Sequence, residues 1–180
     1  MDRNLARCLL EWHGWSLECS VVLPDKAVIC IAPHTSNWDF VYGMLFKRAL
    51  RLKVSFLMKK EWFSFPLGGF MRRLGGIPVD RSMHMSLTDA IAGEFMRRRT
   101  FYLAVTPEGT RSYNNRWKRG FYFIAQKAQV PIVLGYIDYA QKSVGFGSLF
   151  FPTGNVEADM AVIKDYYKAF GAKYPEKFGY

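Results

Sequence analysis

The chain has 180 residues, of which 50% are hydrophobic and 22% are charged. This balance excludes an intrinsically disordered chain and fits one globular domain with a single buried core. The formal net charge of +10 indicates anionic partners, such as phosphate-bearing substrates, acidic carrier proteins, anionic lipid headgroups or nucleic acid.

The cysteines Cys8, Cys19 and Cys30 are odd in number and form no CxxC pair. A disulfide framework or a structural zinc site is therefore not expected, and a reducing compartment is the simpler interpretation. No stretch reaches the roughly eighteen apolar residues of a membrane-spanning helix. Residues 1–7 also lack the apolar core of a signal peptide. We therefore expect a cytoplasmic protein that contacts a membrane only at its surface.

Helical and extended patterns alternate along the whole chain. Apolar spacing predicts helices over residues 1–13, 36–50, 62–74, 82–98, 118–128 and 156–170. Short apolar runs between turn residues predict strands over residues 16–23, 26–32, 53–58, 77–79, 101–105, 132–137 and 143–150. This alternation predicts a single α/β domain over residues 1–180, with a largely parallel or mixed central sheet flanked by helices.

The most informative segment, residues 33–39, has the sequence PHTSNWD and directly follows the predicted strand 26–32. A histidine that takes a proton from a hydroxyl gains from a carboxylate that orients its ring, and His34 and Asp39 are such a pair. Alternatively, Asp39 only completes a capping box with Ser36 at the start of a helix, and His34 is an ordinary loop residue. The segment alone does not decide between these interpretations.

Two further segments also follow predicted strands. Asp80 and Arg81 come directly after the strand 77–79, and the planar guanidinium of Arg81 suits phosphate oxygens, although taken alone the segment is more simply explained by a surface ion pair between these two residues. Residues 106–112, TPEGTRS, follow the buried strand 101–105. This turn presents a carboxylate, hydroxyl groups and Arg111 at the edge of the sheet where α/β proteins bind their ligands.

A fourth segment, Val-Pro-Ile-Val at residues 130–133, opens the next predicted strand. In this order the four segments resemble the motifs of the lysophospholipid acyltransferases, the glycerolipid acyltransferases that include lysophosphatidic acid acyltransferase. The likeness extends from about residue 30 to residue 137. Two departures are Pro33, where many members have asparagine, and residues 1–20, which are too short for the paired N-terminal helices of many members. The matched positions are His34 and Asp39, Gly76 with Asp80 and Arg81, residues 107–112, and residues 130–133.

The resemblance implies an O-acyltransferase that moves a fatty acyl group from acyl-CoA or acyl carrier protein to the hydroxyl of a lysophospholipid, without a cofactor. By this resemblance His34 is the general base and Asp39 orients it. An oxyanion donor is expected near Lys59 or Gly68-Gly69. The remaining residues of the expected substrate site, which hold the acceptor phosphate or shape its pocket, are Arg81, Glu108, Gly109, Thr110, Arg111, Lys118 and Lys59.

Other interpretations stay open at this point. The same pair could send the acyl group to water, which would make a thioesterase, or to a lysolipid that is not glycerol-based. A nucleic-acid-binding module is not expected, because the aromatic residues are not interleaved with the basic runs. The segment 62–74 combines an apolar stripe with Arg72 and Arg73, so it either packs on the sheet or lies on a membrane surface. No pattern indicates an oligomeric state.

Overall fold

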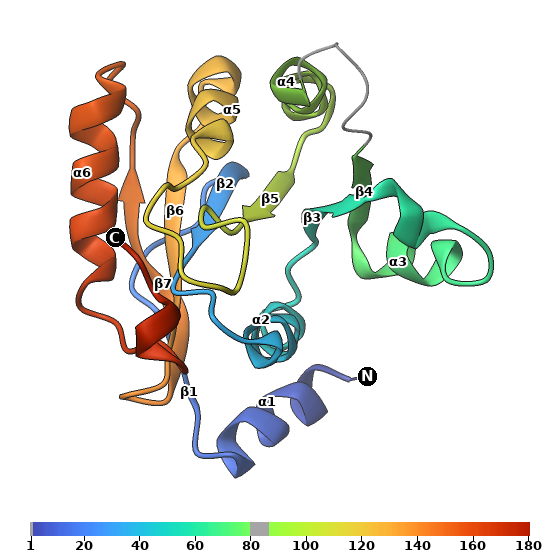
Figure 1. Cartoon of the computed structure of the whole chain (residues 1–180). Helices are drawn as coiled ribbons and strands as arrows, with labels where there is room; N and C mark the ends of the chain where they lie inside the picture. The colour runs from blue at the N-terminus through green and yellow to red at the C-terminus, as the bar shows by residue number, and fades with distance from the viewer. Residues whose placement is uncertain (1, 80–86) are drawn as a thin grey trace.

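The fold, taken from a computed structural model that describes residues 2–79 and 87–180, is built on one twisted sheet. Within these residues seven strands are hydrogen-bonded in the order β1-β7-β6-β2-β5-β3-β4 (Figure 1). Only the β6–β7 pair is antiparallel among these strands. The predicted α/β class with a mixed, largely parallel sheet is confirmed. The strands are β1 Ser16–Cys19, β2 Lys26–Ile31, β3 Val54–Lys59, β4 Gly76–Val79, β5 Phe101–Val105, β6 Ile132–Asp138 and β7 Ser143–Phe150.

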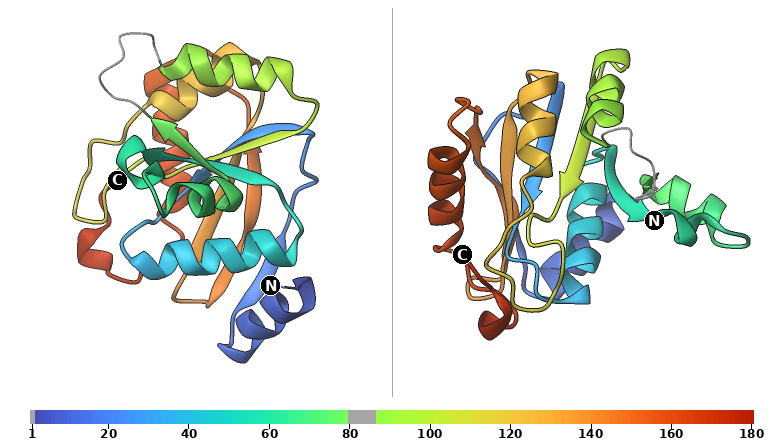
Figure 2. Two further views of the ribbon diagram at one scale, coloured as in Figure 1. Left: turned by 90° about the vertical axis from the view of Figure 1, so that its right-hand side faces the viewer. Right: turned by 45° about the horizontal axis from the view of Figure 1, so that its top comes forward.

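Helices cover both faces of the sheet (Figures 1 and 2). Side chains alternate between the two faces of a strand. Accordingly, Val28 and Cys30 of β2 pack with α4, α5 and α6, whereas Ala27 and Ile29 pack with α1 and α2. The central strand is therefore buried on both sides, as its apolar sequence indicates. The helices are α1 Arg3–Trp12, α2 Asn37–Ala49, α3 Gly68–Leu74, α4 Leu87–Arg97, α5 Gly120–Ala128 and α6 Val156–Tyr167, with short 3₁₀ helices η1 Lys60–Phe63 and η2 Pro175–Lys177.

The predicted helix over residues 62–74 is wrong, because the structure divides this segment into η1, a turn and α3. Pro66 lacks the N–H that a continuous helix requires. At Gly68 the chain folds back so closely that a Cβ would lie 2.1 Å from the carbonyl oxygen of Phe63. The helix expected over 118–128 begins later, at Gly120, since the Lys118 N–H donates to Pro107 O instead (2.7 Å). Of the helix expected over 82–98, the described part begins at Leu87.

The topology brings the two most informative loops together. β2 pairs with β5 on one side and with β6 on the other, all in parallel. The carboxyl ends of neighbouring parallel strands lie at the same edge of a sheet. The segments after β2, at 33–39, and after β5, at 106–112, therefore meet there. Within residues 2–79 and 87–180, no helix is both long and apolar enough to cross a bilayer.

Candidate active site

His34 and Asp39 form a direct pair at the start of α2. The Nδ1 atom of His34 lies 3.1 Å from Oδ2 of Asp39, and the carboxylate is almost fully buried. The same Oδ2 accepts hydrogen bonds from the Thr35 and Ser36 backbone N–H groups, both at 2.8 Å. Ser36 caps α2 and completes a capping box with Asp39. The two interpretations of this segment are thus both realised in one geometry: the cap places the carboxylate against the histidine ring.

Asp39 fixes the protonation pattern of the pair. Burial opposes its ionisation, but hydrogen bonds from His34, Tyr139 and the Ser36 backbone outweigh burial and lower the pKa of Asp39. Tyr139, at the end of β6, donates its hydroxyl to Oδ1 at 2.7 Å. An ionised carboxylate can only accept, so Nδ1 of His34 is the donor in this bond, and in the neutral imidazole the lone pair is then on Nε2. This is the tautomer that a general base needs.

Glu108 supports the histidine from behind. Its Oε1 accepts the backbone N–H of His34 at 2.9 Å, and the residue is 1% exposed. Burial raises the pKa of this carboxyl to about 7, an effect that the His34 N–H only partly offsets. The second oxygen, Oε2, is buried without a hydrogen-bond partner among the described residues. Glu108 therefore holds the backbone of the 33–39 loop at His34, and it lines neither of the two pockets described below.

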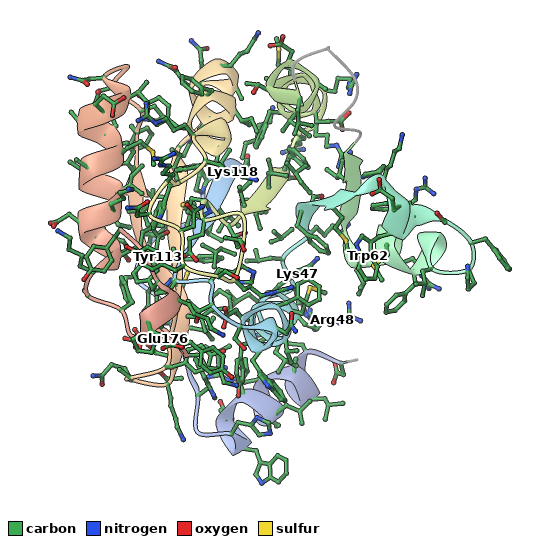
Figure 3. The ribbon with its side chains drawn as sticks, in the orientation of Figure 1. Lys47, Arg48, Trp62, Tyr113, Lys118 and Glu176 are labelled. Carbon is green, nitrogen blue, oxygen red and sulfur yellow. The ribbon has the colours of Figure 1, made fainter. Side chains whose placement is uncertain are left out.

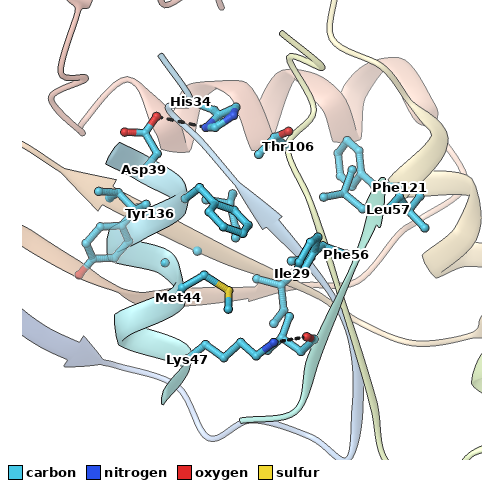
Figure 4. Close-up of a pocket in the computed structure, with 18 of the residues that line it drawn as sticks. Ile29, His34, Asp39, Met44, Lys47, Phe56, Leu57, Thr106, Phe121 and Tyr136 are labelled. Atoms are coloured by element: carbon cyan, nitrogen blue, oxygen red, sulfur yellow. Dashed lines mark hydrogen bonds and ion pairs between the residues drawn. The ribbon is translucent and has the colours of Figure 1, made fainter. Parts of the chain in front are cut away.

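A mostly apolar cavity of about 600 Å³ begins at His34 and Asp39. Figure 4 shows His34 and Thr106 at one end, Ile29, Met44 and Phe56 along the walls, and Lys47 at the other end. This size is in the range of cavities that enclose a small organic ligand. The walls suit a hydrocarbon chain, and His34 and Asp39 line one end of the cavity.

A second pocket of about 390 Å³ is polar. It lies beside the N-terminus of α2, where backbone N–H groups and the helix dipole favour anions. Arg111 and Lys177 line it, and within the described residues neither side chain has an ion-pair partner. The other lining residues are Thr35, Ser36, Asn37, Trp38, Ser112 and Tyr174.

The expected substrate residues are only partly brought together. Gly109 and Lys118 line the apolar cavity with His34, and Gly109 takes a positive φ of 67° in its turn. Arg111 lines the polar pocket instead, and Thr110 is exposed, its hydroxyl accepting the Ser112 N–H. Gly68 and Gly69 begin α3, which packs mainly on η1 and β4. Arg81 and the Lys59 side chain lie outside the described part of the structure.

Sequence patterns missed Tyr139 and Lys47. Tyr139 reaches Asp39 from one hundred residues away, because β6 ends beside the loop that follows β2. The ammonium group of Lys47, on α2, donates hydrogen bonds to two backbone carbonyl oxygens, Val54 O and Leu74 O, both at 2.6 Å. A lysine on the apolar side of an amphipathic helix is the one signal that could have marked it.

Comparison with known proteins assigns the chain to a family. A family model described as Acyltransferase matches residues 17–136, well over half of the chain. The chain belongs to the acyltransferase family. The resemblance carried by the four motifs is thereby confirmed, and the matched range includes both loops of the site.

Two curated relatives are 1-acyl-sn-glycerol-3-phosphate acyltransferases. The one from Saccharomyces cerevisiae is 33% identical over 119 residues, 62% of this chain and 38% of the relative. The one from Streptococcus pneumoniae is 31% identical over 110 residues, 61% and 40% respectively. The chain thus spans about two fifths of the length of these relatives.

Among solved structures, the fold is similar to that of the 1-acyl-sn-glycerophosphate acyltransferase PlsC from Thermotoga maritima. The superposition has a TM-score of 0.63 and 18% sequence identity, and covers 93% of this chain and 77% of that one. At this identity the likeness establishes a common fold.

Proposed function

We propose that this acyltransferase moves a fatty acyl group from a thioester donor to the hydroxyl of a 1-acylglycerol 3-phosphate-like acceptor. The observation that carries the proposal is the His34–Asp39 pair at one end of an apolar cavity. An acyl transfer requires a general base and a binding site for a hydrocarbon chain next to each other. The names of the two curated relatives support the choice of acceptor.

In the proposed reaction, Nε2 of His34 takes the proton from the acceptor hydroxyl. The oxygen attacks the thioester carbonyl carbon, and the tetrahedral intermediate collapses with cleavage of the C–S bond. The leaving thiolate takes the proton from the imidazolium, so the products are an oxygen ester and a free thiol. Asp39 holds the ring and stabilises its charged form during the reaction.

The charged residues around the site suit anionic reactants. Acyl-CoA carries phosphates, and acyl carrier proteins present an acidic surface, so either donor complements a chain of net charge +10. Lys118, at the mouth of the apolar cavity, and Arg111, in the polar pocket, are the described residues placed to bind phosphate. We also propose that the reaction takes place at the cytoplasmic face of a membrane, where a lipid acceptor meets a thioester donor.

Product analysis tests the proposal. The purified chain is incubated with acyl-CoA or acyl carrier protein and with a panel of lysolipids, and products are identified by mass spectrometry. We expect a diacylglycerol phosphate and one equivalent of free thiol. His34→Ala should lower turnover by roughly 10²–10⁴-fold, the usual contribution of a general base. Its circular dichroism spectrum should stay unchanged, since the ring makes one side-chain bond.

The same assay separates the alternatives. Free fatty acid without acylated lipid would identify a thioesterase. Transfer only to a lysolipid without glycerol would show that the proposed acceptor is wrong. Near-wild-type turnover in His34→Ala would remove the proposed base.

A further inference from the structure

The segment formed by η1, the following turn and α3, here called the 60–74 projection, exposes an unusual amount of apolar surface. Phe65, in the turn between η1 and α3, is 99% exposed, and the projection stands out from the body of the molecule (Figures 1 and 2). Trp62, labelled in Figure 3, lies on the same segment and is 51% exposed. Leu67 and Phe70 are 47% and 57% exposed. Exposed large side chains gathered in this way mark a contact surface.

Cations flank these apolar side chains. Residues 60–74 contain Lys60, Arg72 and Arg73 but only one acidic residue, Glu61. Arg72 and Arg73 are exposed in the last turn of α3, and the Arg72 guanidinium lies 5.6 Å from the Phe63 ring centroid. Aromatic residues beside arginines are the combination that binds at the headgroup level of an anionic bilayer.

The projection also adjoins the apolar cavity. Phe56, Leu57 and Met58 of β3 line that cavity, and β3 leads directly into η1. Phe40 and Leu87, both exposed, line the cavity as well and mark an opening. Phe40 packs edge-on against Phe56 at 5.5 Å between ring centroids. The projection thus follows directly on a strand whose side chains line the hydrocarbon site.

We propose that the 60–74 projection is a membrane-docking surface that inserts Phe65, Trp62 and Phe70 among the headgroups of an anionic bilayer. A second copy of the chain is the poorer occupant. A symmetric contact would place the arginines of both copies against one another, in a protein that already carries net charge +10. Delivery of lipid from the bilayer to the cavity rests on the proposed acyl transfer, whereas docking itself does not.

Vesicle co-sedimentation of the intact purified protein tests docking. The vesicles contain either phosphatidylcholine alone or an equal mixture with phosphatidylglycerol. We expect binding to the anionic mixture at low salt and at least about tenfold weaker binding for the double variant Phe65→Ser/Phe70→Ser. Phe151→Ser, which removes an exposed phenylalanine after β7, is the matched control and should bind like the wild type.

A charge-matched pair completes the design. Arg72→Gln/Arg73→Gln should weaken binding to anionic vesicles roughly tenfold or more, because each basic residue near such a surface contributes about 1 kcal/mol. Lys164→Gln/Lys168→Gln, the same charge change in the last turn and at the C-cap of α6, should have a smaller effect. Absence of anionic vesicle binding by the wild type, or equal binding by the phenylalanine double variant and the control, would overturn docking. So would a concentration-dependent dimer, seen by light scattering, that the same double variant abolishes.

Activity measurements distinguish a failure of the docking proposal from a failure of the proposed function. On a short-chain acceptor that is dispersed as monomers in water, the docking variants should turn over like the wild type. On acceptor embedded in anionic vesicles, the same variants should be slower. If the wild type transfers no acyl group at all, the proposed function fails, but vesicle binding still decides the docking surface.

Discussion

The loop of residues 33–39, called the catalytic loop because we propose that it carries the general base, and the 60–74 projection depart from the usual distribution of side chains in opposite ways. In the loop, the polar residues Thr35, Ser36 and Asp39 are buried. In the projection, large apolar residues are exposed. Polar groups are normally outside and large apolar groups inside, so each region is informative because it departs from that rule. The buried groups of the loop are held by hydrogen bonds, whereas nothing among the described residues covers the turn of the projection.

The largest expected effect comes from removing the centre of the loop. Asp39→Ala takes the acceptor away from His34, Thr35, Ser36 and Tyr139. We expect turnover to fall by roughly 10²–10⁴-fold, because the histidine loses the carboxylate that sets its tautomer. The free energy of unfolding should fall by about 2–5 kcal/mol, since buried donors lose their acceptor. Kinetics and urea denaturation measure the two effects.

Tyr139→Phe is the matched control for that variant. It removes only the hydroxyl bond to Asp39 and leaves the dyad in place. We expect a loss of about 1 kcal/mol in stability and a change in turnover below about tenfold. A turnover in Asp39→Ala as high as in Tyr139→Phe would show that the carboxylate acts only as a cap.

The next largest expected effect is that of Glu108 on the free energy of unfolding, and this effect depends on pH. Burial raises its pKa to about 7, against about 4.3 in an unfolded chain. Between these values the folded protein holds a proton that the unfolded chain has released. The free energy of unfolding should therefore fall as pH rises through this window, by about 1–3 kcal/mol from this group. Urea denaturation between pH 4.5 and 8 measures the slope.

Glu108→Gln isolates this contribution. The amide oxygen can still accept the His34 N–H, but the side chain cannot ionise, so the pH profile should be flatter than that of the wild type. Glu108→Ala should lose a further 1–3 kcal/mol or so, because the buried His34 N–H is left unpaired. Parallel pH profiles for the wild type and Glu108→Gln would contradict the role of Glu108 as a buried titrating group.

How far the sequence predicts these two regions depends on the range of the interactions. The His34–Asp39 geometry follows from a local cap, and the meeting of residues 33–39 with 106–112 follows from parallel strands that end at one edge. The burial of Glu108 and the Tyr139 bond depend on strand register over long sequence distances, which local patterns do not encode. The projection was expected as one helix, because apolar spacing does not report the close backbone approach at Gly68.

Lys47, in the last turn of α2, bonds to the last residue of α3, and its replacement has a smaller expected effect on stability. Its ammonium group donates to Val54 O and Leu74 O, and burial, helped by nearby Arg48, lowers the pKa of Lys47. Lys47→Met keeps the apolar stem but loses both bonds, so we expect about 1–3 kcal/mol lower stability. Amide hydrogen exchange should become faster in residues 60–74. Lys53→Met, at an exposed neighbouring position, should leave both measurements nearly unchanged.

The smallest expected effect on the catalytic loop comes from two adjacent glycines in the projection. A Cβ at Gly68 would lie 2.1 Å from the Phe63 carbonyl oxygen, whereas one at Gly69 would meet nothing within 4 Å. Gly68→Ala should force η1 and α3 apart and speed amide exchange in residues 60–74. Gly69→Ala should slow that exchange slightly, because alanine favours a helix over glycine by about 0.5–1 kcal/mol.

This pair tests whether the two regions are independent. α3 packs mainly on η1 and β4, and the His34–Asp39 pair is fixed by bonds within its own loop and to Tyr139. Turnover of an acceptor dispersed in water should therefore be equal in Gly68→Ala and Gly69→Ala, while binding to anionic vesicles should be weaker in Gly68→Ala. A matching loss of turnover on that acceptor would mean that the projection supports the catalytic loop and does not serve docking alone.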